Sequence, residues 1–154
     1  MPGVEGVLRD FASSDAVDGI VLDSAVLRVA CRGQGTELTV LRLPDHSVAK
    51  VIKVEGRPMG VTAAPDGKLV FVTTGRGGKV LLIDPAKDEV TGSVAVGDRP
   101  WGIAVTPDGK TLFVANGPSD DVSIVDVASR KETSRTKLPT GSRPWGVVVV
   151  PGPS

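Results

Sequence analysis

The stretch RPWGIAVTPDGKTLFVAN, residues 99–116, has a similar copy earlier in this chain, and a third copy begins near its end. Residues 57–74 read RPMGVTAAPDGKLVFVTT, and residues 143–151 read RPWGVVVVP. The prolines near the start of these stretches lie 42 and then 44 residues apart: Pro58, Pro100 and Pro144. Agreement at many positions at once predicts an internal repeat of about 42 residues.

The pattern inside each unit favours strands over helices. Four short segments rich in β-branched residues follow one another between turn signals: 102–105, 111–115, 122–127 and 132–138. No window shows the i, i+3, i+4, i+7 apolar spacing of an amphipathic helix over three turns. Four strands in a unit of this period are typical of one β-propeller blade.

Turn residues separate these strands at repeated positions. Asp66-Gly67 and Asp108-Gly109 follow a proline, which suits a tight hairpin with a positive φ at glycine. Asp84 and Asp126 end the third strands, where a carboxylate can accept bonds from free backbone N–H groups. The sequence GRGG (75–78) precedes a strand instead of a helix, so we interpret it as a hairpin turn.

The unit G-x-R-P-[WM]-G-[IV]…P-D-G-K…[LV]-F-V-[AT]-[NT]…[IV]-D resembles the YVTN-type β-propeller repeat over residues 56–151. FVAN (113–116) is the closest match to the strand that names this repeat, whereas FVTT (71–74) departs at its last position. The resemblance implies a relationship to propellers of about six to eight blades. It also implies relatives among exported surface or periplasmic proteins and lactonase-like enzymes.

We therefore predict an all-β fold: a partial β-propeller of three four-stranded antiparallel blades plus one lone C-terminal strand, 145–150. The expected divisions are an N-terminal segment outside the repeats, a degenerate blade, two regular blades, and a closing strand with its tail: residues 1–18, 19–55, 56–97, 98–140 and 141–154. Arg42 stands where Asp84 and Asp126 end their strands, which is why the first blade is considered degenerate.

Three blades leave two uncovered sheet faces, because each blade needs a neighbour on both sides. One explanation is that the chain is the C-terminal part of a larger propeller. The other is that two copies assemble head to tail into a ring of about six blades, with each lone strand entering the partner.

Composition excludes some partners. The 18 Lys and Arg residues balance 18 Asp and Glu residues, so the zero net charge argues against a nucleic-acid or membrane-surface binder. No segment reaches the roughly 18 apolar residues of a membrane span, and the N-terminus does not read as a secretory signal. We expect a soluble chain of unknown compartment. A single cysteine, Cys31, does not settle the redox environment.

Arg57, Arg99 and Arg143 recur on the loop that enters each innermost strand, near one mouth of a propeller channel. Together they would form a partial arginine ring that binds a carboxylate or phosphate, so a small anion or a protein is the expected partner. Alternatively, each arginine pairs with an acid such as Asp98 and locks its loop.

The other repeated positions are interpreted as structural. Met59 stands where Trp101 and Trp145 stand, which indicates a volume requirement between blades; a surface for ligand stacking is the alternative. The remaining members of this structural set are Pro58, Gly60, Pro100, Gly102, Pro144, Gly146, Asp66, Gly67, Asp108, Gly109, Asp84 and Asp126.

No catalytic constellation is evident. His46 is the only histidine and is predicted at a hairpin tip, and Cys31 has no histidine nearby in the repeat register. One His and one Cys do not make a metal or haem site, so we expect no metal and no cofactor. The predicted function is a non-catalytic binding or scaffold module; part of a lactonase-like hydrolase is the alternative.

Overall fold

The structure is a computed structural model that describes residues 19–22, 27–31, 35–42, 47–150 and 152. It contains three four-stranded antiparallel sheets, each connected as a simple meander. The first sheet comprises β1 (Gly19–Leu22), β2 (Leu27–Cys31), β3 (Glu37–Arg42) and β4 (Val48–Lys53). The second comprises β5 (Pro58–Ala63), β6 (Val70–Thr74), β7 (Lys79–Asp84) and β8 (Glu89–Ala95). The third comprises β9 (Pro100–Val105), β10 (Thr111–Asn116), β11 (Asp121–Asp126) and β12 (Lys131–Lys137).

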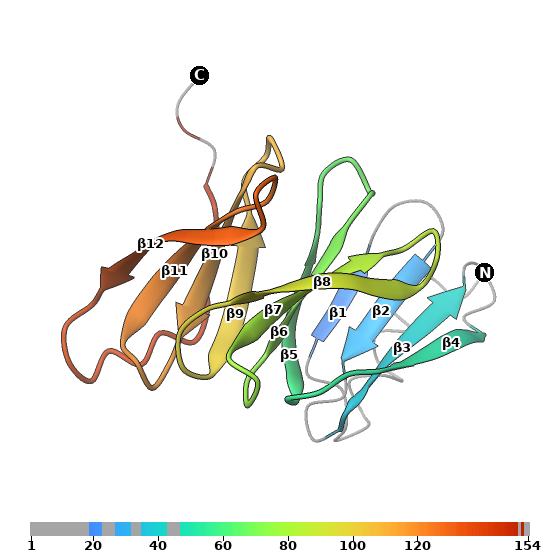
Figure 1. Ribbon diagram of the computed structural model, residues 1–154, viewed down its shortest axis with the longest axis horizontal. Helices are drawn as coiled ribbons and strands as arrows, with labels where there is room; N and C mark the ends of the chain where they lie inside the picture. Colours follow the sequence, from blue (N-terminus) through green and yellow to red (C-terminus); the bar gives the residue numbers. More distant parts are fainter. Residues whose placement is uncertain (1–18, 23–26, 32–34, 43–46, 151, 153–154) are drawn as a thin grey trace.

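The sheets stand side by side in chain order (Figure 1). β5, the first strand of the middle sheet, contacts β1 on one side and β9 on the other, while β8 contacts β12. First strands therefore neighbour first strands, as the inner strands of propeller blades do. The described residues contain no helix, so the predicted all-β partial propeller is confirmed.

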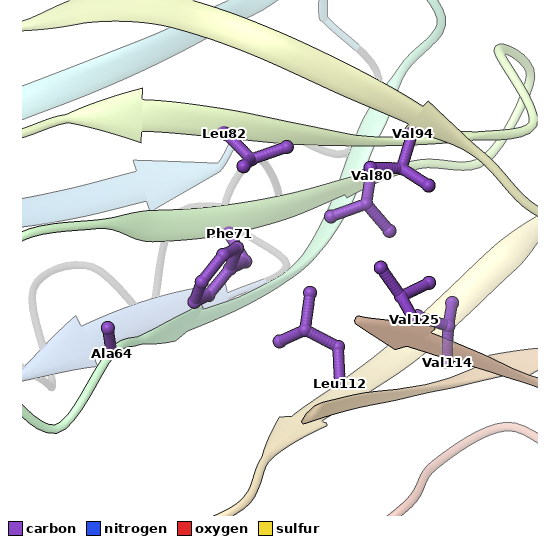
Figure 2. Close-up of a cluster of buried hydrophobic side chains, with 8 residues drawn as sticks. All are labelled: Ala64, Phe71, Val80, Leu82, Val94, Leu112, Val114 and Val125. Carbon is purple, nitrogen blue, oxygen red and sulfur yellow. The ribbon is translucent and has the colours of Figure 1, made fainter. Parts of the chain in front are cut away.

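Two apolar cores lie between the sheets, and β6 contributes to both. Because side chains alternate across a strand, Val70 and Val72 of β6 pack against the first sheet. Phe71, between them, packs against the third sheet in the cluster of Figure 2. All five residues of β6 are buried. The middle sheet therefore has an apolar cluster on each of its two faces.

Glycine lets neighbouring inner strands approach closely. A Cβ built on Gly60 of β5 would lie 2.2 Å from the carbonyl oxygen of Trp101 in β9. A Cβ built on Gly102 of β9 would lie 2.6 Å from Cα of Gly146 and 2.8 Å from the carbonyl oxygen of Trp145. Both distances are shorter than a Cβ tolerates, so these two positions accept only glycine without movement of the next strand.

Thr73 of β6 links the second and third sheets by hydrogen bonds. Its buried hydroxyl accepts from the Gly60 N–H at 2.7 Å and donates to the Trp101 carbonyl oxygen at 2.9 Å. Ala115 occupies the equivalent position in β10, 42 residues later, and has no hydroxyl. The contact between β9 and the C-terminal segment therefore lacks this hydrogen-bonded link.

Residues 143–150, which include the predicted lone strand 145–150, lie against β9 as β9 lies against β5. The repeated contacts at Gly102 place them in the position of the next inner strand. They form no ladder with any strand that the structure describes.

Replacing Gly60 with alanine is predicted to destabilise the protein by about 1–3 kcal/mol, because the new methyl group would overlap a backbone oxygen that can move only with β9. Gly146→Ala is the matched control, since no described atom lies within 4 Å of a Cβ at that position. Urea unfolding of both variants measures the difference. Equal free energies of unfolding would contradict the packing described here.

Candidate functional site

The three repeated arginines share an unusual backbone conformation. Their φ angles are positive, at 63° for Arg57, 48° for Arg99 and 41° for Arg143. This left-handed region is costly for residues with a Cβ, by about 1–2 kcal/mol, and favours glycine or asparagine. The chain nevertheless has arginine at all three positions. All three arginines therefore adopt a conformation that glycine would adopt at lower cost.

Hydrogen bonds from the neighbouring hairpin hold these loops. The carbonyl oxygen of Arg57 accepts from the Gly75 N–H at 2.8 Å, and that of Arg99 accepts from the Gly117 N–H at 3.4 Å. The two pairs are equivalent, since each donor and each acceptor is displaced by 42 residues. These hydrogen bonds hold the backbone at Arg57 and Arg99 in place, and each arginine side chain extends from a backbone position that the fold defines.

A buried polar cluster of the third sheet also supports the loop that carries Arg99. The Asn116 side-chain amide donates to Asp121 Oδ1 at 2.7 Å and to Ser123 Oγ at 2.8 Å. Ser123 Oγ in turn accepts from the Gly97 N–H at 3.3 Å. Asn116 ends the FVAN segment, so this motif positions the loop before β9.

Arg57, Arg76 and Arg99 line one small hollow of about 170 Å³ where the second and third sheets meet the C-terminal segment. The other described lining residues are Met59, Gly75, Trp101 and Trp145. No acidic side chain is among them. Three cationic side chains and no acidic one make the hollow electrostatically positive.

A wider, more open groove of about 710 Å³ adjoins this hollow. The two share Gly75, Arg76 and Arg99, and the groove adds Gly77, Gly78, Asp98 and Pro118. The glycines at 75, 77 and 78 leave its wall without side chains. Arg76 and Arg99 therefore stand at the boundary between the hollow and the groove.

Among the described residues, neither Arg76 nor Arg99 forms a salt bridge. One alternative from the sequence was that Asp98 pairs with Arg99 and locks its loop. The described residues contain no salt bridge between Arg99 and Asp98. Arg76 and Arg99 thus line the hollow without a carboxylate partner among the described residues.

Arg143 is placed differently from the other two repeated arginines. It does not line the hollow, and its backbone N–H donates to Asp120 Oδ1 at 2.7 Å. Arg76 lies beside Arg57 and Arg99 instead. Sequence reasoning missed Arg76 because the repeat has Pro118 at the equivalent position and because GRGG was interpreted only as a hairpin turn.

The two tryptophans differ in environment: Trp101 is packed against the chain, whereas Trp145 is largely exposed. The six-membered ring of Trp101 lies over Gly117, within 2.1 Å of where a Cβ would be, and Met59 lies similarly over Gly75. The Trp101 and Trp145 ring centroids are 4.5 Å apart at an interplanar angle of 42°. Trp145 remains 67% exposed. Trp101 therefore fills the junction between strands, while Trp145 offers an open ring face.

The turn aspartates act within their own turns. Asp66 and Asp108 each accept the backbone N–H two residues later at 3.0 Å, and Gly67 and Gly109 have φ of 70° and 72°. Asp84 accepts from the Ala86 N–H at 2.9 Å, and Asp126 from the Ser129 N–H at 2.7 Å. Hydrogen bonds from Thr106 and Lys110 lower the pKa of Asp108, as those from Ser129 lower the pKa of Asp126.

Two residues considered for catalysis take no part in this description. His46 lies outside the described residues. Cys31 ends β2, and its side chain is not described. The described residues include no cluster of three metal-ligating side chains and no helix capable of crossing a membrane.

No model of a known protein family matches the chain, and no curated protein matches it. A solved structure titled Kuenenia stuttgartiensis hydrazine synthase matches with a TM-score of 0.74 and 21% sequence identity. The match covers 79% of this chain and 36% of that one, so this chain spans about a third of its structural neighbour. This likeness concerns the fold. The chain has the architecture of a β-propeller module with three of its blades described.

The carboxylate of Asp120 is predicted to hold the C-terminal segment in a pH-dependent way. Backbone hydrogen bonds from Arg143 and then Gly141 lower its pKa. Because the folded pKa lies below the unfolded one, this contribution is complete above the unfolded pKa and disappears as pH falls through the folded pKa. Acidification to that range should therefore release residues 141–150, seen as faster hydrogen exchange there.

Asp120→Ala should release the same segment at neutral pH, while Asp88→Ala, at another left-handed turn position, should not. If the segment exchanges at the wild-type rate in Asp120→Ala, Asp120 does not hold it.

Proposed function

We propose that this β-propeller module is a non-catalytic binding protein whose hollow holds a small anion, such as a carboxylate or phosphate group. The observation that carries the proposal is the convergence of Arg57, Arg76 and Arg99 on one hollow without an acidic lining residue. Guanidinium groups bind carboxylate and phosphate oxygens in bidentate fashion. Trp101 and Trp145 would contact an apolar part of the same ligand.

The backbone supports this role independently. Arg99 has a left-handed φ that asparagine or glycine would adopt at lower cost, which favours a role for its side chain. Arg76 and Arg99 also border the wider groove, which would admit the remainder of a larger anionic ligand. A ligand would thus enter through the groove and place its anionic group between the arginines.

We also propose that the chain is related to proteins with YVTN-type repeats. We further propose that it divides into the units 19–55, 56–97, 98–140 and 141–154. We infer that the three sheets are the C-terminal part of a larger propeller. The likeness in fold to a chain of greater length supports this inference. The lactonase-like alternative rests on the sequence resemblance alone.

Titration with inorganic phosphate and with citrate, followed by tryptophan fluorescence, tests the anion site because both tryptophans line the hollow. Loss of a charged hydrogen-bond partner costs about 1.5–3 kcal/mol, so Arg99→Asn should weaken binding by about 10-fold to 100-fold. Its free energy of unfolding should stay the same or rise, because asparagine tolerates the left-handed backbone.

Arg130→Asn is the matched control. Arg130 also has a positive φ, of 55°, but lies in the turn between β11 and β12, where it donates to the Thr91 carbonyl oxygen. This variant should bind both anions as the wild type does. No binding of either anion by the wild type, or equal weakening by both substitutions, would refute the proposed site.

A further inference from the structure

A second hollow, of about 250 Å³, lies between the first and second sheets. Its walls come from the end of β4, the linker that follows, and strands β6 to β8 with the turn between β6 and β7. Two of its lining residues are lysines, Lys53 and Lys79, and we call it the lysine hollow. None of its described lining residues lines the hollow beside Arg99, so the two are separate sites.

The equivalent place between the second and third sheets is filled by side chains. Asn116 is fully buried there, and its amide donates to Asp121 and Ser123. On the neighbouring strand β12, the Arg135 guanidinium donates to both carboxylate oxygens of Glu132, each at 2.9 Å. Polar side chains that bond one another therefore occupy this junction.

The first junction has shorter side chains at three of the equivalent positions. The residues 42 positions earlier in the chain are Thr74 for Asn116, Val90 for Glu132 and Ser93 for Arg135. The pairing register agrees, because Leu81 pairs with Ser93 as Ser123 pairs with Arg135. The lysine hollow therefore lies where longer side chains fill the junction between the second and third sheets.

The lining of the lysine hollow is partly apolar. Val54 is buried and Leu81 is half-buried, and both belong to the apolar cluster between the first two sheets. Val90 is 40% exposed, although it is a large aliphatic residue. An apolar ligand group that covers these side chains would remove their surface from water, which is favourable.

The charges of the lysine hollow differ from those of the next junction. Lys53 and Lys79 stand where the next unit has Ala95 and Asp121. Neither lysine forms a salt bridge with any residue that the structure describes. Glu55 is the only acidic residue among the described lining residues, so the lining keeps a net positive charge. This charge favours an anionic ligand group.

Backbone and side-chain hydrogen bonds hold the walls in place. The Thr74 hydroxyl donates to the Lys79 carbonyl oxygen at 3.2 Å, and the Gly77 N–H donates to the Thr74 carbonyl oxygen at 3.0 Å. On the first sheet, the Val54 N–H donates to the Thr36 carbonyl oxygen at 2.8 Å. A ligand would therefore enter a site that is already formed, which lowers the cost of binding.

We propose that the lysine hollow binds a small aliphatic monocarboxylate such as hexanoate. The aliphatic chain contacts Val54, Leu81 and Val90, and the carboxylate accepts hydrogen bonds from the ammonium groups of Lys53 and Lys79. A dry cavity of about 150 Å³ holds benzene, so the larger space here suits a chain of about six carbons with its carboxylate. This inference does not depend on the anion site.

Isothermal titration calorimetry of the full chain with hexanoate tests the proposal. Hexylamine carries the same chain with the opposite charge, and acetate carries the same charge without the chain. Hexanoate should bind saturably, and both controls should bind at least about 10-fold more weakly. A lack of saturable hexanoate binding would overturn the proposal, in favour of a gap that holds only water. Equal binding of hexylamine or of acetate would overturn it as well.

Two substitutions probe the two parts of the lysine hollow. Lys79→Gln should weaken hexanoate binding by about 10-fold, because a charged hydrogen-bond partner is lost. Ser93→Leu should weaken it by filling the hollow while both lysines remain. Lys131→Gln is the matched control, since Lys131 begins β12 and does not line the hollow. Hexanoate binding that is unchanged in Lys79→Gln and in Ser93→Leu would contradict the proposed site.

Arg99→Asn distinguishes this site from the anion site, because hexanoate is itself an anion. This variant should bind hexanoate as the wild type does. Lys79→Gln should in turn bind phosphate and citrate as the wild type does, because Lys79 does not line the hollow beside Arg99. Equal loss of hexanoate binding in Arg99→Asn and Lys79→Gln would overturn the inference of a second site.

Discussion

The structure depends on how closely each inner strand approaches the next. The carbonyl oxygen of Trp101 occupies the space that a Cβ on Gly60 would need, and the C-terminal segment approaches Gly102 in the same way. Glycine at these positions sets the spacing of the sheets. The apolar clusters between the sheets fill the space that this spacing leaves. The Thr73 hydroxyl then joins the two closest strands by hydrogen bonds.

This spacing also creates the candidate site. The loops that enter β5 and β9 lie at the same end of neighbouring strands, so Arg57 and Arg99 reach one hollow, and the turn after β6 adds Arg76. Hairpin hydrogen bonds fix the left-handed backbone of the first two. Two of the three left-handed arginines, Arg57 and Arg99, thus have cationic side chains at the junction of two sheets.

Much of the fold can be predicted from the sequence, because the strand positions inferred in one copy of the repeat support those inferred in the other copies. The strands of the second and third sheets, their hairpins and the place of the C-terminal segment were all predictable from periodicity and turn residues. The arginine site was less accessible. Arg57 and Arg99 share a loop position, but Arg76 lies outside the repeat, and Arg143 joins Asp120 instead of the hollow. Sequence spacing does not report backbone φ, so the left-handed arginines required coordinates.

The most direct test of this account is a nuclear Overhauser measurement between backbone protons of successive inner strands. Close approach at the glycines predicts cross-peaks between the Gly60 Hα protons and backbone protons at Trp101 and Gly102. It also predicts cross-peaks between the Hα protons of Gly102 and Gly146. Contacts from Gly60 and Gly102 confined to their own sheets would contradict the packing of the three sheets on which both proposed sites depend.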